Sequence, residues 1–309
     1  MRLLRSVKDN ESLKAGTVAS IGNFDGVHKG HQALLARLME KAKWLGLPSL
    51  LVLFEPQPGE YFKQAEAPVR LSSLREKLAC LKNAGVDYVL CLKFNKQLAQ
   101  MDARIFAKHY LFQGIHCRYL LTGEDFRFGY QREGDLNLLQ ALAKKYHSEV
   151  AFFPAYQVDK QRVSSTLVRK ALASAALDEA ANYLGRPYSV CARVVKGAGL
   201  GRQWGIPTAN MLLNRPSFAL NGVYLVRVLC QGHLYNAVAN IGTRPTVDGS
   251  EKKLEVYILN FSSDIYGEML EVFFLRKLRN EVKFESVEQL VTQIKQDIQA
   301  AETFFSKAY

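Results

Sequence analysis

The sequence has no apolar run near the roughly 20 residues that a membrane-spanning helix needs. The first residues lead directly into charged ones, so no hydrophobic region of a secretory signal forms there. The five cysteines are odd in number, widely spaced and without a CxxC pair, which argues against a disulfide framework and against a zinc site. We therefore expect a cytoplasmic protein whose reduced cysteines pack as small hydrophobic residues.

Several nucleotide-binding and nucleic-acid-binding signatures are also missing. No GxxxxGK[ST] loop occurs, and the glycines of segment 197–201 do not form a GxGxxG fingerprint. The sequence has no RNP, zinc-finger or helix-turn-helix pattern and no internal repeat. A net charge of +12 indicates an anionic partner or simply a basic surface. Because the Lys and Arg residues are scattered, charge alone leaves nucleic acids and phosphorylated small molecules open.

The 309 residues, 48% of them hydrophobic, favour two well-packed domains. As far as about residue 185, short apolar runs alternate with amphipathic stretches. Strands are expected at 17–21, 49–54, 87–92, 118–122 and 149–154. Helices are expected at 32–45, 72–84, 103–112, 135–146, 165–173 and 177–184. This alternation predicts an α/β domain whose parallel sheet is covered by helices on both faces.

The pattern changes at residues 185–187, where Gly, Arg and Pro follow one another. Beyond them, strand-like runs without intervening helices are expected at 188–195, 222–229, 233–240, 253–260 and 269–275. Such a series predicts a small antiparallel barrel or sandwich. The chain then ends in an amphipathic helix, for which Ser286 is the expected N-cap. The apolar stripe of this helix should lie on the barrel; it consists of Val287, Leu290, Val291, Ile294 and Ile298.

A glycine-rich turn, residues 22–31, joins the first expected strand to its helix and reads GNFDGVHKGH. Glycines let the backbone approach a ligand closely, and the amides of a helix N-terminus bind phosphate. His28 and His31 are three residues apart and should project from the same side of the first helical turn. One histidine near a helix start is usually a polar surface residue, but this pair after a strand and a glycine turn predicts a triphosphate site.

Three further segments of the first half carry polar or aromatic groups near expected strand ends or helix starts. Residues 54–58 read FEPQP, residues 122–129 read TGEDFRFG and residues 163–169 read VSSTLVR. The hydroxyls and amides of 164–166 suit a phosphate, and Arg169 adds a cation one turn later, although the segment could also be a plain cap. Asp125 comes at the carboxyl end of a strand, where α/β sheets bind ligands, but it could equally be a turn residue.

The second half contains GRQWGIPTAN at residues 201–210. Thr208 and Asn210 stand at alternating positions, so an extended backbone would present both side chains to a metal-bound nucleotide, although an ordinary turn is equally compatible. The segment is followed by NGVY at 221–224, NIGTRPT at 240–246, LEVYILNF at 254–261, YG at 266–267 and LRNEVKF at 278–284.

With these motifs in this order, the chain resembles the bacterial bifunctional riboflavin kinase/FAD synthetase family over nearly its whole length. Residues 1–184 resemble the FMN adenylyltransferase module, and residues 185–309 resemble the riboflavin kinase domain. The resemblance implies a Rossmann-like sheet of the HxGH nucleotidyltransferase type, followed by an antiparallel β-barrel that carries a terminal helix. It also implies phosphorylation of riboflavin to FMN by ATP, then adenylyl transfer from ATP to FMN, which yields FAD and pyrophosphate.

The family further implies ATP and Mg²⁺ at both sites, with riboflavin, FMN and FAD as substrates and products. Small molecules are then the expected partners, with neither nucleic acid nor membrane. A monomer is expected, and weak self-association stays open. One alternative keeps the fold but only one of the two activities. Another is a basic nucleic-acid-binding or regulatory protein, for which no signature is found.

Site residues are carried over motif by motif. The catalytic set implied by the resemblance is His28, His31, Arg169 and Glu255. Glu255 would accept the proton of the ribityl 5′-hydroxyl, whereas by pattern alone it reads as an outward-facing strand residue. Thr208 and Asn210 would bind Mg²⁺. The nucleotide- and flavin-binding set is Gly22, Asn23, Phe24, Asp25, Gly26, Phe54, Pro56, Pro58, Phe62, Asp125, Phe126, Phe128, Ser164, Ser165, Thr166, Gly199, Gly201 and Arg279. The four later phenylalanines of this set could stack on an isoalloxazine ring or simply belong to the core.

Overall fold

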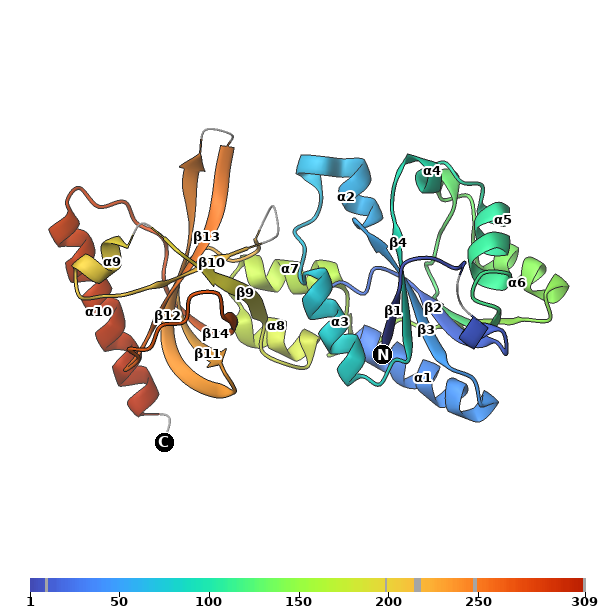
Figure 1. The fold of residues 1–309 in the computed structure, drawn as a ribbon, viewed down its shortest axis with the longest axis horizontal. Helices are drawn as coiled ribbons and strands as arrows, with labels where there is room; N and C mark the ends of the chain where they lie inside the picture. Colours follow the sequence, from blue (N-terminus) through green and yellow to red (C-terminus); the bar gives the residue numbers. More distant parts are fainter. Residues whose placement is uncertain (9–10, 198, 214–217, 247–248, 308–309) are drawn as a thin grey trace. The chain divides into compact units, whose positions relative to one another are not determined.

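The structure, a computed structural model, describes residues 1–8, 11–197, 199–213, 218–246 and 249–307. The chain divides into two compact units, one of Met1–Pro68 and Lys77–Ser164, the other of Val69–Glu76 and Ser165–Tyr309. The first unit is built on a parallel sheet and the second on a closed barrel (Figure 1).

Parallel strands form the sheet of the first unit. Its order, β1-β4-β3-β2-β5-β6, confirms the predicted parallel topology. In the described residues these strands are β1 (Arg2–Leu4), β2 (Thr17–Ile21), β3 (Ser49–Glu55), β4 (Tyr88–Lys93), β5 (Cys117–Gly123) and β6 (Glu149–Phe153). The chain builds outward from β2 in one direction and then, with β5, in the other. The strand order therefore reverses between β2 and β5, and parallel sheets commonly bind ligands at the carboxyl ends of the strands at such a reversal.

Helices cover both faces of this sheet, as the sequence predicts. On one face, α1 (Lys29–Leu45) buries Leu34, Leu35 and Leu38 in a cluster with strand residues. The other face is covered by α5 (Ala103–Phe106), the π-helix η3 (Ala107–Phe112) and α6 (Leu136–Lys145). The sheet is thus apolar on both sides, which explains why its strands read as continuous hydrophobic runs.

The bounds of some elements differ from the predictions, because the spacing of apolar residues is irregular near their ends. α1 begins at Lys29 rather than at residue 32, and the predicted helix 103–112 changes from α to π after Phe106. α3 (Leu74–Asn83) is shorter than predicted. Elements too short to show a period are not predicted: β1, η1 (Glu11–Leu13), α2 (Pro58–Lys63), η2 (Gln64–Glu66), α4 (Lys96–Ala99), η4 (Tyr130–Arg132), β7 (Gln157–Val158) and β8 (Gln161–Arg162).

The second unit starts with two helices, α7 (Ser165–Ala173) and α8 (Leu177–Leu184), which have the predicted bounds. α8 ends at Gly185, whose φ of 73° is the left-handed conformation that glycine adopts without strain.

The barrel that follows is closed and antiparallel, which decides between the predicted barrel and sandwich. Its order is β10-β13-β12-β11-β14-β9. The strands are β9 (Ser189–Val195), β10 (Ala209–Leu212), β11 (Gly222–Cys230), β12 (His233–Thr246), β13 (Gly249–Ile258) and β14 (Met269–Arg279). The sequence does not predict β10 or the short α9 (Leu200–Gln203), because each has only four residues. β10 pairs with β9 and β13 and so closes the barrel.

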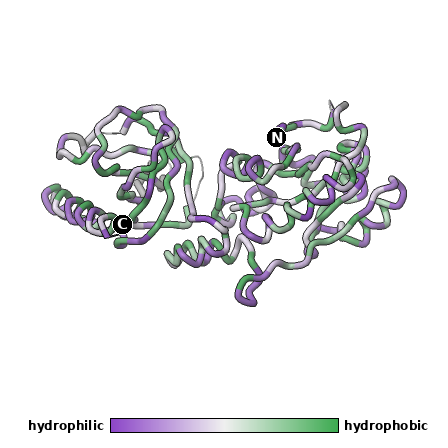
Figure 2. The backbone as a smooth tube through the Cα atoms, turned by 90° about the horizontal axis from the view of Figure 1, so that it is seen from below, coloured by the Kyte–Doolittle hydropathy of each residue, from purple (hydrophilic) through white to green (hydrophobic). Residues whose placement is uncertain are grey.

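The terminal helix α10 (Val287–Ser306) begins as predicted, with the Ser286 side chain accepting a hydrogen bond from the Gln289 amide. Its hydrophilic and hydrophobic residues alternate along the tube in Figure 2. Only the later part packs in the barrel-side core, through Ala301 and Phe305. Four of the five residues of the predicted stripe line a cavity instead: Val287, Leu290, Ile294 and Ile298.

A two-point ion pair joins α10 to the end of β14. Arg279 donates from Nε to Oδ1 of Asp297 at 2.9 Å and from a terminal nitrogen to Oδ2 at 2.8 Å. Gln293 Nε2 also donates to Asp297 Oδ1, at 3.1 Å. The Asp297 side chain is only 8% exposed, so a partner lost here leaves a buried charge without compensation.

We expect Asp297→Asn to destabilise the second unit by about 2 kcal/mol, because the amide cannot accept both guanidinium hydrogen bonds. Urea unfolding followed by circular dichroism would measure the change. The control is Glu302→Gln, an exposed carboxylate on the same helix, for which a change below about 0.5 kcal/mol is expected. Equal stability of the two variants would contradict the role of the ion pair.

Candidate active sites

The first candidate site is the turn between β2 and α1, at the strand-order reversal. Phe24, Gly26 and Val27 have left-handed backbone conformations, with φ of 46°, 78° and 42°. For a phenylalanine and a β-branched valine this conformation costs about 1–3 kcal/mol each. Both side chains are buried in the core on the α1 face, and this packing offsets the cost. Asp25 is buried as well, whereas Asn23 is exposed. The shape of the turn is therefore set by hydrophobic packing.

The two histidines of the turn lie together, as the sequence predicts. His28 is the N-cap of α1, and its Nδ1 accepts a hydrogen bond from the His31 amide at 3.3 Å. The two rings stack with centroids 3.7 Å apart and planes tilted by 16°. A Cβ on Gly30 would meet the His28 ring at 3.2 Å, so glycine at this position makes room for the imidazole. His28 thus lies just before the helix and not within its first turn.

His31 differs from His28 in its surroundings. Its Nδ1 is buried and has no hydrogen-bond partner in the described part of the chain. Burial lowers the pKa of His31 well below its usual value, and the nearby His28 and Lys77 lower it further. The His31 ring is therefore neutral near pH 7.

Lys77, a residue that the sequence analysis missed, supports the same turn. It is 1% exposed, and its Nζ donates to the backbone carbonyl of Asn23 at 2.6 Å. A signal for it exists in the sequence: Lys77 stands three residues after Leu74 and four before Leu81, on the apolar stripe of α3. A lysine at such a core-facing position indicates a buried cation with a specific task.

Asp125, expected at the end of β5, is ion-paired in this structure with Arg162 of β8. Arg162 also lies 3.8 Å from Glu124. The Asp125 carboxylate is mostly solvent-exposed, so the pair is accessible. Arg162 is a second residue that the sequence analysis missed.

The four candidate flavin-stacking phenylalanines belong to one aromatic chain. Phe54 and Phe62 both contact Phe94, each with centroids 5.7 Å apart. Phe106 then joins Phe54 to Phe128, at 6.2 and 5.9 Å. Phe126 stacks on Phe128 at 5.6 Å. Phe62 is 64% exposed and Phe128 is buried, so the chain of rings runs from solvent into the core. Phe94 and Phe106 were not expected from the sequence.

The remaining candidates of the first half lie at element starts. Pro58 is the first residue of α2, and Pro56 precedes it in a cis peptide bond with Glu55. Ser164 ends the first unit, whereas Ser165, Thr166 and Arg169 belong to α7 in the second unit. Arg169 Nε donates to the Val69 carbonyl at 2.5 Å. The prediction that this segment acts together with the histidine pair stays a prediction.

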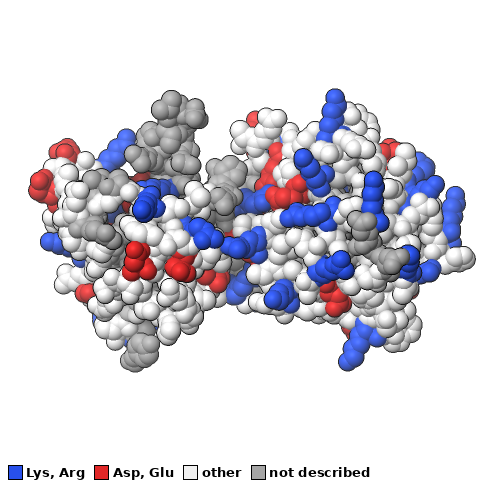
Figure 3. Space-filling view, in the orientation of Figure 1, with Lys and Arg blue, Asp and Glu red and all other residues white. Residues whose placement is uncertain are grey.

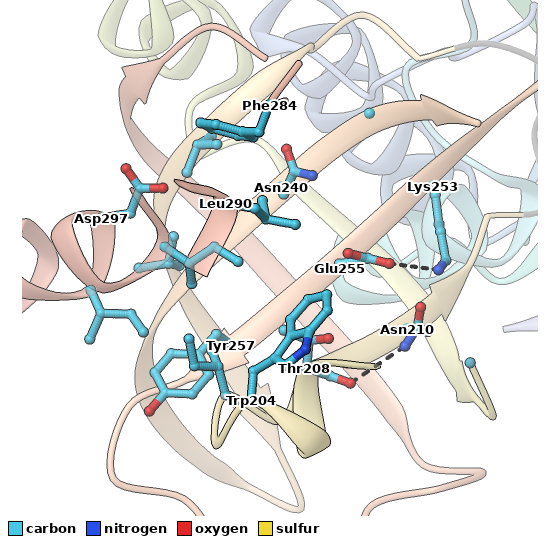
Figure 4. A pocket seen from close by; sticks show the side chains of 18 of the residues that line it. Trp204, Thr208, Asn210, Asn240, Lys253, Glu255, Tyr257, Phe284, Leu290 and Asp297 are labelled. Atoms are coloured by element: carbon cyan, nitrogen blue, oxygen red, sulfur yellow. Dashed lines mark hydrogen bonds and ion pairs between the residues drawn. The ribbon is translucent and has the colours of Figure 1, made fainter. Parts of the chain in front are cut away.

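The second candidate site is a cavity of about 820 Å³ in the second unit (Figure 4). Its wall combines the strands β10, β12 and β13, the segment around α9 and the first half of α10. All six candidates of the second half line it: Gly199, Gly201, Thr208, Asn210, Glu255 and Arg279. The cavity is also lined by aromatic residues that were not among the predicted site residues: Trp204, Tyr257 and Phe284.

Glu255 lies between two amides in this cavity. Strand register places Asn210 of β10 opposite Glu255 on one side and Asn240 of β12 opposite it on the other. Residues directly opposite in an antiparallel pair present their side chains on the same face. The Glu255 carboxylate also pairs with Lys253, whose Nζ lies 2.6 Å from Oε1. Because Lys253 is two residues earlier on β13, strand alternation alone would have placed it on this face.

Asn210 is held against the backbone. A Cβ on Gly197 would lie 2.4 Å from Asn210 Nδ2, so a larger residue here would displace the Asn210 side chain. Asn210 Nδ2 makes a long contact of 3.5 Å with the Thr208 carbonyl, and Oδ1 is buried with no partner in the described residues. Thr208 lines the same cavity, and an orphaned amide oxygen together with a threonine hydroxyl offers ligands that a hard cation accepts.

Three findings concern the molecule as a whole. Lys and Arg are spread over the visible face of the first unit (Figure 3), in keeping with their scatter along the sequence. No described helix has the length and apolarity to cross a bilayer. Within the described residues, no group of three or more His, Cys, Asp or Glu side chains could hold a metal ion.

Two protein families match the chain in tandem. The family described as FAD synthetase matches residues 10–167, and the one described as riboflavin kinase matches residues 184–305. The bifunctional riboflavin kinase/FMN adenylyltransferase of Haemophilus influenzae is 44% identical over 307 residues, which are 99% of this chain and 100% of that protein. The protein of the same name from Pseudomonas fluorescens is 47% identical over 302 residues, 97% of each chain.

A solved structure from Streptococcus pneumoniae, named macrolide-efflux protein, is also similar. It has a TM-score of 0.80 and 32% identity, with 97% of this chain and 98% of that one covered. Its name differs from those of the sequence relatives, although the fold is shared along nearly the whole chain.

The lowered pKa of His31 predicts a pH-dependent stability. Below about pH 6.5 the unfolded chain protonates this histidine while the folded protein does not. Stability is therefore full above about pH 6.5 and falls as the pH drops toward the lowered pKa of the folded state. We expect His31→Gln to flatten this dependence, measured as the melting temperature of the first unit between about pH 5 and 7.5. His109→Gln, at an exposed position, should keep the wild-type slope. If the melting temperature of His31→Gln depended on pH as steeply as that of the wild type, His31 would not be the source of this pH dependence.

Proposed function

The chain belongs to the family of bifunctional riboflavin kinase/FMN adenylyltransferases, and from that premise we propose which residues carry each reaction. The enzyme phosphorylates riboflavin to FMN with ATP, and it transfers an adenylyl group from ATP to FMN, which yields FAD and pyrophosphate. The tandem match to both families leaves nothing that favours a single retained activity.

We assign adenylyl transfer to residues 1–184 and the kinase reaction to residues 185–309. The extents of the two family matches support this division. This boundary follows α8, which Gly185 caps, whereas the compact units divide earlier, after Ser164, so that α7 and α8 group with the barrel.

In the adenylyl transfer, an oxygen of the FMN phosphate attacks the α-phosphorus of ATP, and the bond to the pyrophosphate leaving group breaks. The nucleophile is already an anion, so the reaction needs no general base. The protein's task is alignment and stabilisation of charge on the phosphates. We propose that residues 22–26, His28 and His31 do this at the β2–α1 turn, with residues 164–166 and Arg169 as further phosphate ligands.

The tautomer of His28 supports this role. Because its Nδ1 accepts the His31 amide hydrogen, the neutral ring carries its proton on Nε2. Nε2–H is then a donor that a phosphate oxygen can use. Burial lowers the pKa of His31, so this ring is neutral near pH 7 and interacts with phosphate through hydrogen bonds and not as a fixed charge.

We propose that the aromatic chain supplies the flavin surface of the first unit. Phe54, Phe62, Phe126 and Phe128 are connected through Phe94 and Phe106. Phe62 is exposed and Phe54 and Phe126 are half-buried, so these rings are accessible to a flavin, whereas the buried Phe128 supports them from the core. Pro56 and Pro58 shape the segment that carries Phe62, and Asp125 contributes a polar group next to the rings.

In the kinase reaction, the ribityl 5′-oxygen attacks the γ-phosphorus of ATP, the bond to ADP breaks, and Glu255 accepts the hydroxyl proton. The observation that carries this proposal is the position of Glu255 between Asn210 and Asn240 in a cavity large enough for a ligand. Gly199 and Gly201 allow close approach of the loop backbone to phosphates. Arg279 lines the cavity as well, with its guanidinium held in place by the ion pair with Asp297.

Magnesium fits the donor set of the second unit. Thr208 and the orphaned Oδ1 of Asn210 would hold it, and it would supply charge neutralisation at the ATP phosphates. We further propose a monomer in the cytoplasm. All five cysteines lie in the described part of the chain and none forms a disulfide, which supports a reducing compartment.

Two substitutions should separate the activities. His28→Ala is expected to lower FAD formation about 10²-fold or more and to leave FMN formation intact, because a phosphate donor is lost. Glu255→Ala is expected to lower riboflavin phosphorylation about 10²–10⁴-fold and to leave adenylylation of supplied FMN intact. Chromatographic separation of the flavins measures both. Loss of both activities in either folded variant would contradict the assignment.

The magnesium proposal has its own test. Asn210→Ala should raise the Mg²⁺ concentration for half-maximal kinase activity about tenfold, because an oxygen ligand is removed. The Mg²⁺ requirement of adenylyl transfer should not change. Asn236→Ala is the matched control, since Asn236 lies on β12 outside the cavity lining. A wild-type Mg²⁺ requirement in Asn210→Ala would overturn the assignment.

A further inference from the structure

We propose that Lys253 is a positioning residue of the kinase reaction, which holds one oxygen of Glu255 so that the other faces the substrate hydroxyl. The inference rests on the proposed role of Glu255 as the base. In Figure 4 the two side chains extend from the same face of β13 and meet in the cavity.

The first step of the argument is geometric. Lys253 Nζ lies 2.6 Å from Glu255 Oε1, a short distance typical of a charge-assisted hydrogen bond. Among the described residues, Lys253 is the one hydrogen-bond partner of the Glu255 carboxylate. Oε1 is therefore occupied, and Oε2 is the oxygen left to accept a proton.

The second step concerns freedom of motion. The side chains of Lys253 and Glu255 are 33% and 34% exposed, so the protein does not enclose the carboxylate on all sides. A glutamate with this much space samples several rotamers and carboxylate orientations. A base acts only within hydrogen-bond reach of the proton that it removes. A second contact point on Oε1 restricts the carboxylate to orientations in which Oε2 stays available.

The third step considers the other partners of the same anion. Asn210 and Asn240 stand opposite Glu255 on the neighbouring strands and belong to the same cavity wall. The Asn210 amide nitrogen is directed to the Thr208 carbonyl, and within the described residues neither the Asn210 nor the Asn240 side chain hydrogen-bonds to the Glu255 carboxylate. Lys253 is thus the group in position to orient the carboxylate.

A double-mutant cycle tests the proposal: Lys253→Gln, Glu255→Gln and the double variant. Lys253→Gln should lower kcat of riboflavin phosphorylation about tenfold and leave KM for riboflavin and ATP within about twofold of wild type. In the Glu255→Gln background the same substitution should have no further effect on kcat, because its action goes through the carboxylate. Lys253→Arg should restore most of the loss.

Two controls show that the variants fold. FMN adenylylation by the same preparations should remain at the wild-type rate, since it uses the other site. Lys295→Gln, on an exposed part of α10 outside the cavity lining, should behave as wild type in both reactions.

Three results would overturn the proposal. If Glu255→Gln lowers kcat and Lys253→Gln does not, the positioning role fails while the role of Glu255 stands. If Lys253→Gln mainly raises KM for ATP, equally in both backgrounds, Lys253 contacts nucleotide phosphate instead. If Glu255→Gln leaves kcat unchanged, the proposed base is wrong and the inference fails with it.

Discussion

Both sites depend on side chains that lie directly against a glycine backbone. The His28 ring covers Gly30, and the Asn210 amide covers Gly197, at distances from a hypothetical Cβ of 3.2 and 2.4 Å. In each case the contact restricts a polar side chain at the start of a helix or of a strand. A methyl group at Gly197 would displace the Asn210 amide, and one at Gly30 would shift the His28 ring slightly, from the geometry on which the inferred phosphate and metal chemistry rests.

The two sites handle charge in different ways. At the β2–α1 turn, the His31 ring stacks on His28 and stays neutral, because burial and then the nearby His28 and Lys77 lower its pKa; the buried Lys77 ammonium donates to the Asn23 carbonyl. In the barrel, a carboxylate is matched by Lys253 and flanked by amides. The first arrangement suits a reaction whose nucleophile is already an anion, and the second suits one that must remove a proton. The basic surface can attract the anionic substrates of both.

The spacing of apolar residues predicted those helices and strands that are long enough to show a regular repeat. The bounds of β2, α7 and α8 follow from apolar spacing alone. β10 has four residues and no readable period, yet it carries Asn210 and closes the barrel. Lys77 contacts a carbonyl 54 residues earlier in the chain, and no local rule specifies such a contact. The aromatic chain likewise needed Phe94 and Phe106, which only packing connects to the predicted rings.

By itself the sequence determined the order of strands and helices, the strand–turn–helix setting of His28 and His31, and the resemblance that ties Glu255, Thr208 and Asn210 to one reaction. The tertiary structure decided which strands are neighbours. It made β2 and β5 neighbours at the point where the strand order reverses, and it placed Glu255 between Asn210 and Asn240. The reason is that strand pairing satisfies backbone hydrogen bonds and apolar burial over the whole sheet, a condition that no short window of sequence contains.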